Sequence, residues 1–157
     1  MLEFIKKSLI KKSQTLAVAE SLTAGNLQAM IGSVSWASWF FKGWMTAYTE
    51  SMKVKHLWVD QAHAHRVNCV SQRVANEMAL WVCTLFNSTR GISTTGYAEA
   101  WGAFSVPFAH YAIAHFDWNE YLVVDGWKIK GTLDMSRVEM QKFVSQHVIE
   151  KYYGILH

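Results

Sequence analysis

Hydrophobic and polar residues alternate along this chain with two periods, one typical of helices and one typical of strands. Residues 2–13 place apolar side chains at helical spacing, with their lysines on the other side. The same spacing predicts further helices over 21–32, 49–57, 71–86 and 134–153. Short apolar or alternating runs predict strands over 15–20, 42–48, 91–95, 105–116 and 121–130.

The order of these elements predicts the fold class. Strands that alternate with helices favour a parallel sheet, because each crossover helix covers one face of it. Residues 117–120 join two strand-like runs and predict an antiparallel hairpin, and residues 33–41 predict a connection with a short helical turn. Gly154 is a natural terminator for the last helix. We therefore expect an α/β protein, a three-layer α/β/α sandwich with a mixed, mostly parallel sheet, in one domain over residues 1–157.

Length and composition narrow the class of protein. The 157 residues suit one domain with its own core, and 51% hydrophobic residues with a single proline argue against disorder. The net charge of +3 is mild and the basic residues are spread out, so we expect no nucleic-acid partner. No apolar stretch approaches the roughly 20 residues of a membrane span, and the start lacks the apolar region of a secretory signal. These features predict a cytoplasmic protein with no membrane partner.

The segment 15–25 carries the most specific signal. Its apolar run stops at Glu20 and Ser21, and the small residues that follow suit a tight strand-to-helix turn, with the helix starting at Ser21 or Thr23. A hydroxyl at such a junction faces the positive end of a helix and unpaired backbone N–H groups, which stabilise an alkoxide or an anion. The alternative is that Ser21 or Thr23 only caps the helix.

Tryptophan and cysteine residues have several interpretations. Trp36, Trp39 and Trp44 suit the core, an interface or stacking on a ligand. Cys69 and Cys83 lack a paired motif, so we expect buried thiols rather than a disulfide.

Two histidines raise the question of a metal site. His63 and His65 could offer two imidazoles to a metal if their segment were extended, but no carboxylate or cysteine pattern completes a site. We therefore expect neither a metal nor a cofactor.

Several short motifs, taken in order, resemble the carboxy-terminal domain of the CinA competence and damage-inducible proteins. The family pattern includes A-E-S-x-T-G-G, a Ser-x-x-Phe stretch, G-x-x-x-Y-x-x-x-x-K, V-S before A-x-x-M-A, and T-G-x-A-G-P before a hairpin. The corresponding segments here are 19–25, 37–40, 43–53, 70–79 and 95–98. The resemblance covers most of the chain. Stand-alone members of this family include nicotinamide-nucleotide amidases.

This resemblance implies a catalytic dyad. The family's amidase activity is attributed to a serine nucleophile with a lysine partner, and the matching positions are Ser21 and Lys53. A lysine activates a serine only in its neutral form, which burial favours, so the role requires a shielded Lys53. A solvated lysine on a short amphipathic helix is the alternative. The implied substrate is a small molecule, a nucleotide-like carboxamide such as nicotinamide mononucleotide.

Other residues are candidates for binding the substrate or its oxyanion. Backbone N–H groups near Leu22 and Thr23 suit an oxyanion. Thr95 and Gly96 match the family's Thr-Gly motif and belong to the same set.

Three side chains complete the candidate site, each with an alternative role. Tyr48 could hydrogen-bond the dyad or be anchored in the core. Ser71 could contact a ligand or cap its helix. Arg137 could hold an anionic group of the substrate or be a surface residue.

The chain departs from the family pattern in the loop 96–103. Family members carry a glycine-rich run there, and glycines let backbone amides approach a phosphate closely. Here Glu99 and Trp101 place a negative charge and a bulky ring near that space. The family's first arginine before the last helix is replaced by Leu133. These changes predict that a nucleotide phosphate is poorly received.

Three functions are compatible with these patterns. The first is an amidohydrolase that cleaves a carboxamide through Ser21 and Lys53. The second is a divergent, non-catalytic family member that serves as an oligomeric binding or interaction protein. The third is hydrolysis of a different amide or ester without a phosphate, in a pocket reshaped by Tyr97, Glu99 and Trp101. In each case we expect a homo-oligomer, since related domains assemble and the aromatic 36–44 region offers apolar surface.

Overall fold

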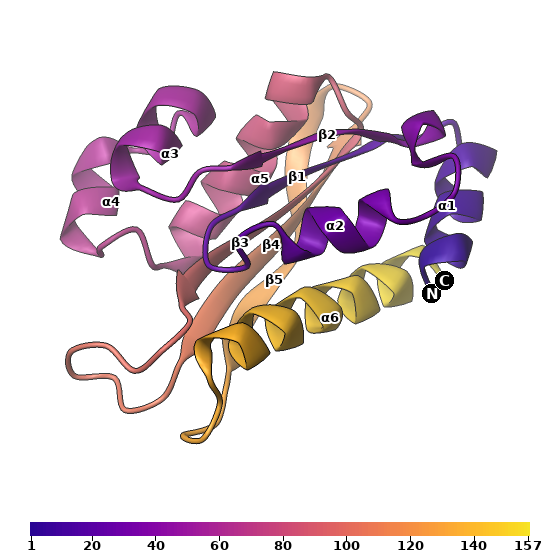
Figure 1. Ribbon diagram of the computed structural model, residues 1–157. Coiled ribbons are helices and arrows are strands. Elements are labelled where there is room, and N and C mark those ends of the chain that lie inside the picture. Colours follow the sequence, from indigo (N-terminus) through magenta and orange to yellow (C-terminus); the bar gives the residue numbers. More distant parts are fainter.

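A five-stranded sheet forms the centre of the computed structural model, which describes residues 1–157 (Figure 1). The strand order is β2-β1-β3-β4-β5. The strands are β1 (Leu16–Glu20), β2 (Phe41–Thr46), β3 (Arg90–Tyr97), β4 (Phe108–Asp117) and β5 (Glu120–Lys130). All five lie at or near the predicted positions.

Helices cover both faces of the sheet, which confirms the three-layer α/β/α sandwich (Figure 1). One face packs against α1 (Leu2–Lys11), α2 (Asn26–Gly32) and α6 (Arg137–Leu156). The other face packs against α3 (Glu50–Leu57), α4 (Gln61–Arg66) and α5 (Gln72–Phe86). A short 3-10 turn, η1 (Ala37–Trp39), precedes β2, as predicted. No helix combines the length and the apolar character that crossing a membrane requires.

The sheet is mixed, as expected, with one strand running against the others. Strand β1 pairs in parallel with both β2 and β3, whereas β4 is antiparallel to β3 and to β5. Strand β4 is therefore the only one with reversed direction. The carboxyl ends of β1, β2 and β3 meet at one edge, the place where α/β folds form binding crevices.

Strand β1 is buried along its whole length, which explains why its sequence is a continuous apolar run rather than an alternating one.

Small residues bring α5 close to the neighbouring strand β3. A Cβ atom added at Gly91 would lie 2.3 Å from the carbonyl oxygen of Ala79 and 2.5 Å from Sγ of Cys83. This close approach leaves no room for a side chain at position 91.

The start of α2 differs from the prediction. The helix begins at Asn26, after a turn in which Ala24 and Gly25 have φ of 51° and 95°, so neither Ser21 nor Thr23 caps it. The cap comes instead from Glu20, at the end of β1. Its carboxylate accepts hydrogen bonds from the backbone N–H groups of Gly25, Leu27 and Gln28 at 3.1, 3.1 and 2.7 Å.

The last helix also differs from the prediction at both ends. It begins at Arg137, because Ser136 and Glu139 form a capping box. It continues through Gly154 to Leu156, so the expected termination at Gly154 is wrong. A glycine inside a helix costs about 1 kcal/mol. Burial of Leu156, only 6% exposed, contributes about 2 kcal/mol and outweighs that cost.

Helix α4 was not predicted from the sequence. Asp60 begins it by accepting a hydrogen bond from the backbone N–H of His63 at 2.6 Å. Strand β4 also starts later than predicted, after Pro107, which has no N–H to donate to a neighbouring strand.

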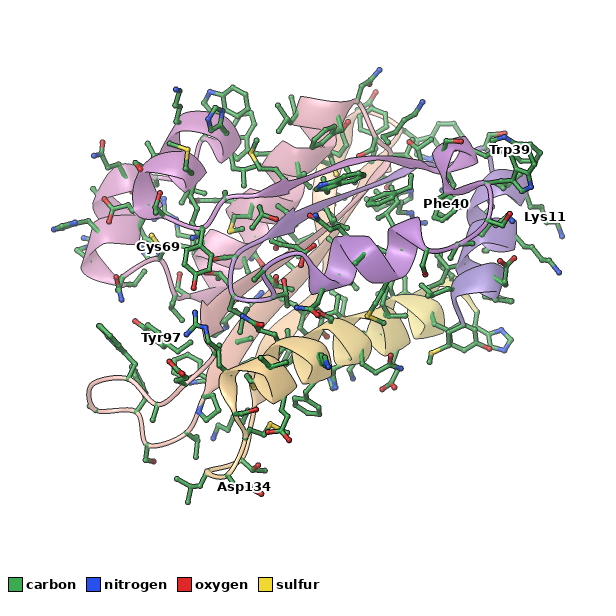
Figure 2. The ribbon with its side chains drawn as sticks, viewed as in Figure 1. Lys11, Trp39, Phe40, Cys69, Tyr97 and Asp134 are labelled. Atoms are coloured by element: carbon green, nitrogen blue, oxygen red, sulfur yellow. The ribbon has the colours of Figure 1, made fainter.

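The aromatic residues before and within β2 lie on the surface. Trp36, Trp39 and Trp44 are all exposed, so the core interpretation of these residues is wrong. Figure 2 shows Trp39 near Lys11, at the end of the molecule where both termini lie. Cys69 and Cys83 are buried free thiols, as expected.

Replacing Glu20 by Gln tests the cap of α2. An amide has one acceptor oxygen where the carboxylate has two, and its NH2 group would face N–H donors. Since hydrogen bonds to charged groups contribute about 1.5–3 kcal/mol, we expect the free energy of unfolding to fall by about 2 kcal/mol. Urea denaturation measures this loss. Glu150→Gln, the same change on the exposed face of α6, is the control and should alter stability by less than about 0.5 kcal/mol.

Candidate active site

Ser21 and Lys53 come together at the carboxyl edge of the sheet. Ser21 directly follows β1, and Lys53 lies in the middle of α3, a helix that Thr49 caps by accepting from the N–H of Met52. The Lys53 amine donates hydrogen bonds to Ser21 Oγ at 2.9 Å and to the carbonyl oxygen of Tyr48 at 3.0 Å. Lys53 is 2% exposed and Ser21 6%, so the solvated-lysine interpretation is wrong.

The environment of Lys53 disfavours its charged form. Burial lowers the pKa of the Lys53 amine, and the nearby Cys69 thiol opposes this shift only in part. Lys53 forms no salt bridge, and its two hydrogen-bond partners are a hydroxyl and a carbonyl. A buried amine without a counter-ion is stabilised in its neutral form. A neutral amine beside a serine hydroxyl can accept its proton.

A cavity of about 390 Å³ opens over this pair. Most of the predicted site residues line it: Ser21, Leu22, Tyr48, Lys53, Thr95, Gly96 and Arg137. The remaining wall comes mainly from segments 49–50, 68–70 and 97–101. Figure 2 shows Cys69 and Tyr97, both lining residues, at the same end of the molecule, opposite the termini.

Two backbone donors beside Ser21 are free. Neither the N–H of Leu22 nor that of Thr23 donates a hydrogen bond within the chain. Both belong to the turn between β1 and α2, rather than to the first turn of the helix as predicted. Unpaired N–H groups next to a nucleophile can stabilise an oxyanion.

Two of the candidate residues have side chains outside the cavity. Thr23 is fully buried and does not line the cavity, and its hydroxyl contacts the Thr94 hydroxyl at 2.7 Å. Ser71 caps α5 by accepting from the N–H of Val74, and His63 contacts it at 2.9 Å. The capping interpretation of Ser71 is therefore confirmed.

Tyr48 and Arg137 form one cluster with Glu99 at the mouth of the cavity. Tyr48 is half exposed, so the core-anchored interpretation is wrong. Arg137 donates to the Tyr48 hydroxyl and forms an ion pair with Glu99 at 3.0 Å. Glu99, in the loop after β3, therefore pairs with the guanidinium that could otherwise bind an anionic group of the substrate.

Sequence reasoning missed the wall formed by Asn68 and Cys69. Both residues have positive φ, 49° and 60°, which is costly for residues other than glycine. The Thr95 hydroxyl holds this segment by donating to the carbonyl oxygen of Cys69 at 2.7 Å. Thr95 therefore shapes the cavity by supporting its opposite wall. No local sequence signal marks this contact, because its partners are 26 residues apart.

The two histidines considered for a metal site point to different partners. Both lie on α4, a helix rather than an extended segment. His63 contacts Ser71, while His65 contacts Glu50 at 3.4 Å. No group of three His, Cys, Asp or Glu residues is placed to hold a metal ion.

Comparisons with known proteins agree with the motifs. The profile of the CinA C-terminal domain matches residues 1–145. A CinA-like protein of Picosynechococcus is 44% identical over 87 residues, which are 55% of this chain and 21% of that protein. A relative from Natranaerobius thermophilus is 33% identical over 148 residues, 91% of this chain and 36% of that protein. The chain thus spans between about a fifth and about a third of the length of these relatives.

A solved structure shares the fold. A competence-damaged protein (CinA) superfamily protein from Klebsiella pneumoniae superposes with a TM-score of 0.85 at 18% identity, over 99% of this chain and 94% of that one. The family profile covers nearly the whole sequence, and the two structures share the fold over nearly their whole length. This chain belongs to the CinA C-terminal domain family.

Proposed function

We propose that this protein is an amidohydrolase that hydrolyses a carboxamide, nicotinamide mononucleotide or a related compound, through a Ser21–Lys53 dyad. The observation that supports this is the 2.9 Å contact between a buried lysine amine and a serine hydroxyl at the base of a cavity. The resemblance of the Ala19–Gly25 segment to the family motif supports the choice of reaction.

The first half of the reaction forms an acyl-enzyme. Neutral Lys53 takes the proton of Ser21, and Oγ attacks the carboxamide carbon. The carbonyl oxygen becomes an oxyanion, which the N–H groups of Leu22 and Thr23 can stabilise. The tetrahedral adduct then collapses, Lys53 gives its proton to the leaving nitrogen, and ammonia departs.

The second half releases the acid. A water molecule gives a proton to Lys53 and attacks the ester carbon. As the second tetrahedral adduct collapses, Lys53 returns this proton to Ser21 Oγ and the carboxylic acid leaves. The amine thus carries one proton in each half-reaction. The overall change is amide plus water to acid plus ammonia, without a metal or cofactor in the scheme.

A second candidate function is that of a non-catalytic, oligomeric interaction protein. The exposed Trp36, Trp39 and Trp44 favour it, because large aromatic side chains are enriched at protein interfaces. Trp36 directly precedes η1, Trp39 lies in η1 and Trp44 lies in β2. The cavity instead lies at the carboxyl edge of the sheet. Self-association through this surface is therefore compatible with either function.

Ammonia release from nicotinamide mononucleotide tests the dyad directly. We expect release by the purified protein, and a loss of kcat of about 10³-fold or more in Ser21→Ala and in Lys53→Ala, because each removes one member of a unit that acts together. Lys55→Ala, an exposed lysine of the same helix, is the matched control and should retain activity. Circular dichroism establishes that each variant is folded.

Two results would contradict the amidase proposal. One is the absence of ammonia release from folded protein with the nucleotide and with other carboxamides. The other is equal activity in Ser21→Ala and the unmodified protein. The first result would leave the interaction protein as the better description, and the second would exclude Ser21 as the nucleophile.

The charge state of Lys53 predicts the pH profile of the reaction. The base must be neutral, so activity falls as pH drops below the pKa of Lys53. Because burial lowers the pKa of this amine, we expect kcat/KM to rise with pH and to level off below the ordinary lysine pKa of about 10.4. In Lys53→Arg the guanidinium stays protonated, so both the activity and the increase of kcat/KM with pH should be lost. A profile independent of pH would exclude Lys53 as the base.

A further inference from the structure

The mouth of the cavity offers no free cation. Its charged lining residues are Glu50, Lys53, Glu99 and Arg137. Both terminal nitrogens of Arg137 are engaged, Nη1 with Glu99 at 3.0 Å and Nη2 with the Tyr48 hydroxyl. Lys53 lies at the base, where Ser21 and a backbone carbonyl occupy its amine. A phosphate binds strongly where an unpaired guanidinium or ammonium replaces its hydration, and here the one guanidinium at the mouth is already paired with Glu99.

The other charged side chains at the mouth of the cavity are carboxylates. Glu99 reaches the mouth from the loop after β3, and Glu50 from the first turn of α3. Glu50 contacts only the imidazole of His65, at 3.4 Å, among the ionisable groups. One guanidinium therefore faces two carboxylates, which repel an anionic ligand and attract a cationic one.

An aromatic wall stands beside these carboxylates. Trp101 lines the cavity and is 59% exposed, with its ring 6.0 Å from that of Tyr97 at an interplanar angle of 13°. Two backbone hydrogen bonds between Trp101 and Phe104, 3.1 and 2.9 Å long, fold the loop back on itself. The Tyr97 hydroxyl accepts from the Asn68 side chain at 3.1 Å, which ties the wall to the opposite side of the cavity. The indole ring is thus presented by a supported loop.

From this arrangement we infer that the cavity selects a planar, positively charged aromatic carboxamide without a phosphate, with Trp101 as its stacking surface and Glu99 as its electrostatic partner. This inference rests on the proposed function and names its substrate class. An N-ribosylated pyridinium carboxamide has the required ring, charge and amide. A cationic ring gains both from stacking on indole and from the cation–π interaction.

Binding of two probes to Ser21→Ala tests the selection without turnover. The probes are nicotinamide riboside, which is cationic and lacks a phosphate, and nicotinamide mononucleotide, which adds the phosphate to the same ring and amide. Isothermal titration calorimetry at low salt should give a dissociation constant for the riboside at least about tenfold lower than for the mononucleotide. Equal affinities, tighter binding of the mononucleotide, or no binding of either probe would overturn the inference.

Two second substitutions in the Ser21→Ala background identify the residues responsible. Glu99→Gln removes the carboxylate that pairs with the Arg137 guanidinium. The ratio of the mononucleotide to the riboside dissociation constant should therefore fall about tenfold or drop below one. Trp101→Ala should weaken riboside binding about tenfold. Trp118→Ala, in the β4–β5 turn and 90% exposed, is the matched control and should change neither affinity. A riboside affinity that is unchanged by Trp101→Ala would exclude the stacking role.

The binding and hydrolysis measurements distinguish failure of the ligand class from failure of the amidase proposal. Preferential riboside binding without ammonia release by the unmodified protein would contradict the amidase proposal and leave the ligand class intact. Ammonia release from the mononucleotide, with no preference for the riboside, would support the amidase and contradict the selection of phosphate-free ligands.

Discussion

The burial of the Lys53 amine without a counter-ion is the constraint on which the candidate site depends. An ammonium group removed from water must be paired or must lose its proton. Here its hydrogen-bond partners are the Ser21 hydroxyl and the Tyr48 carbonyl, neither of which carries a charge that would offset the desolvation of an ammonium. The same burial that costs folding free energy favours the neutral amine that the proposed mechanism requires. Stability and chemistry are therefore opposed at this position, as they are at many sites of catalysis.

Glu20 and Ser21 are neighbours at the end of β1, but their side chains have different surroundings. Glu20 is fully buried and holds three backbone N–H groups of the following turn and helix, while Ser21 presents its hydroxyl to the cavity. Because the carboxylate draws these N–H groups together, α2 starts only at Asn26. The turn that remains leaves the N–H groups of Leu22 and Thr23 unpaired. One carboxylate thus anchors the start of α2, next to a turn whose two N–H groups stay unpaired.

The loop between β3 and β4 lines the cavity but lies outside the framework of strands and helices. The strands and helices match those of a solved relative at 18% identity, so the framework tolerates extensive sequence change. The loop carries Glu99 and the stacked rings of Tyr97 and Trp101. It projects beyond the sheet, where its changes leave the core undisturbed (Figure 1). Changes in this loop can therefore alter the cavity while the contact between Ser21 and Lys53 is kept.

The sequence by itself determined the strands, most helices and the sandwich, because hydrophobic periodicity is a local property that packing on a sheet reinforces. Its motifs also identified the family and nominated Ser21 and Lys53. Only the tertiary structure decided how far α6 extends past Gly154, which carboxylate caps α2, and that Arg137 pairs with Glu99. Each of these depends on a contact between distant elements or on the burial of a particular side chain. The pair of Arg137 and Glu99 joins residues 38 apart, which no local pattern can reveal. The Glu20 cap is close in sequence but requires the backbone turn at Ala24 and Gly25, which forms only in the folded chain.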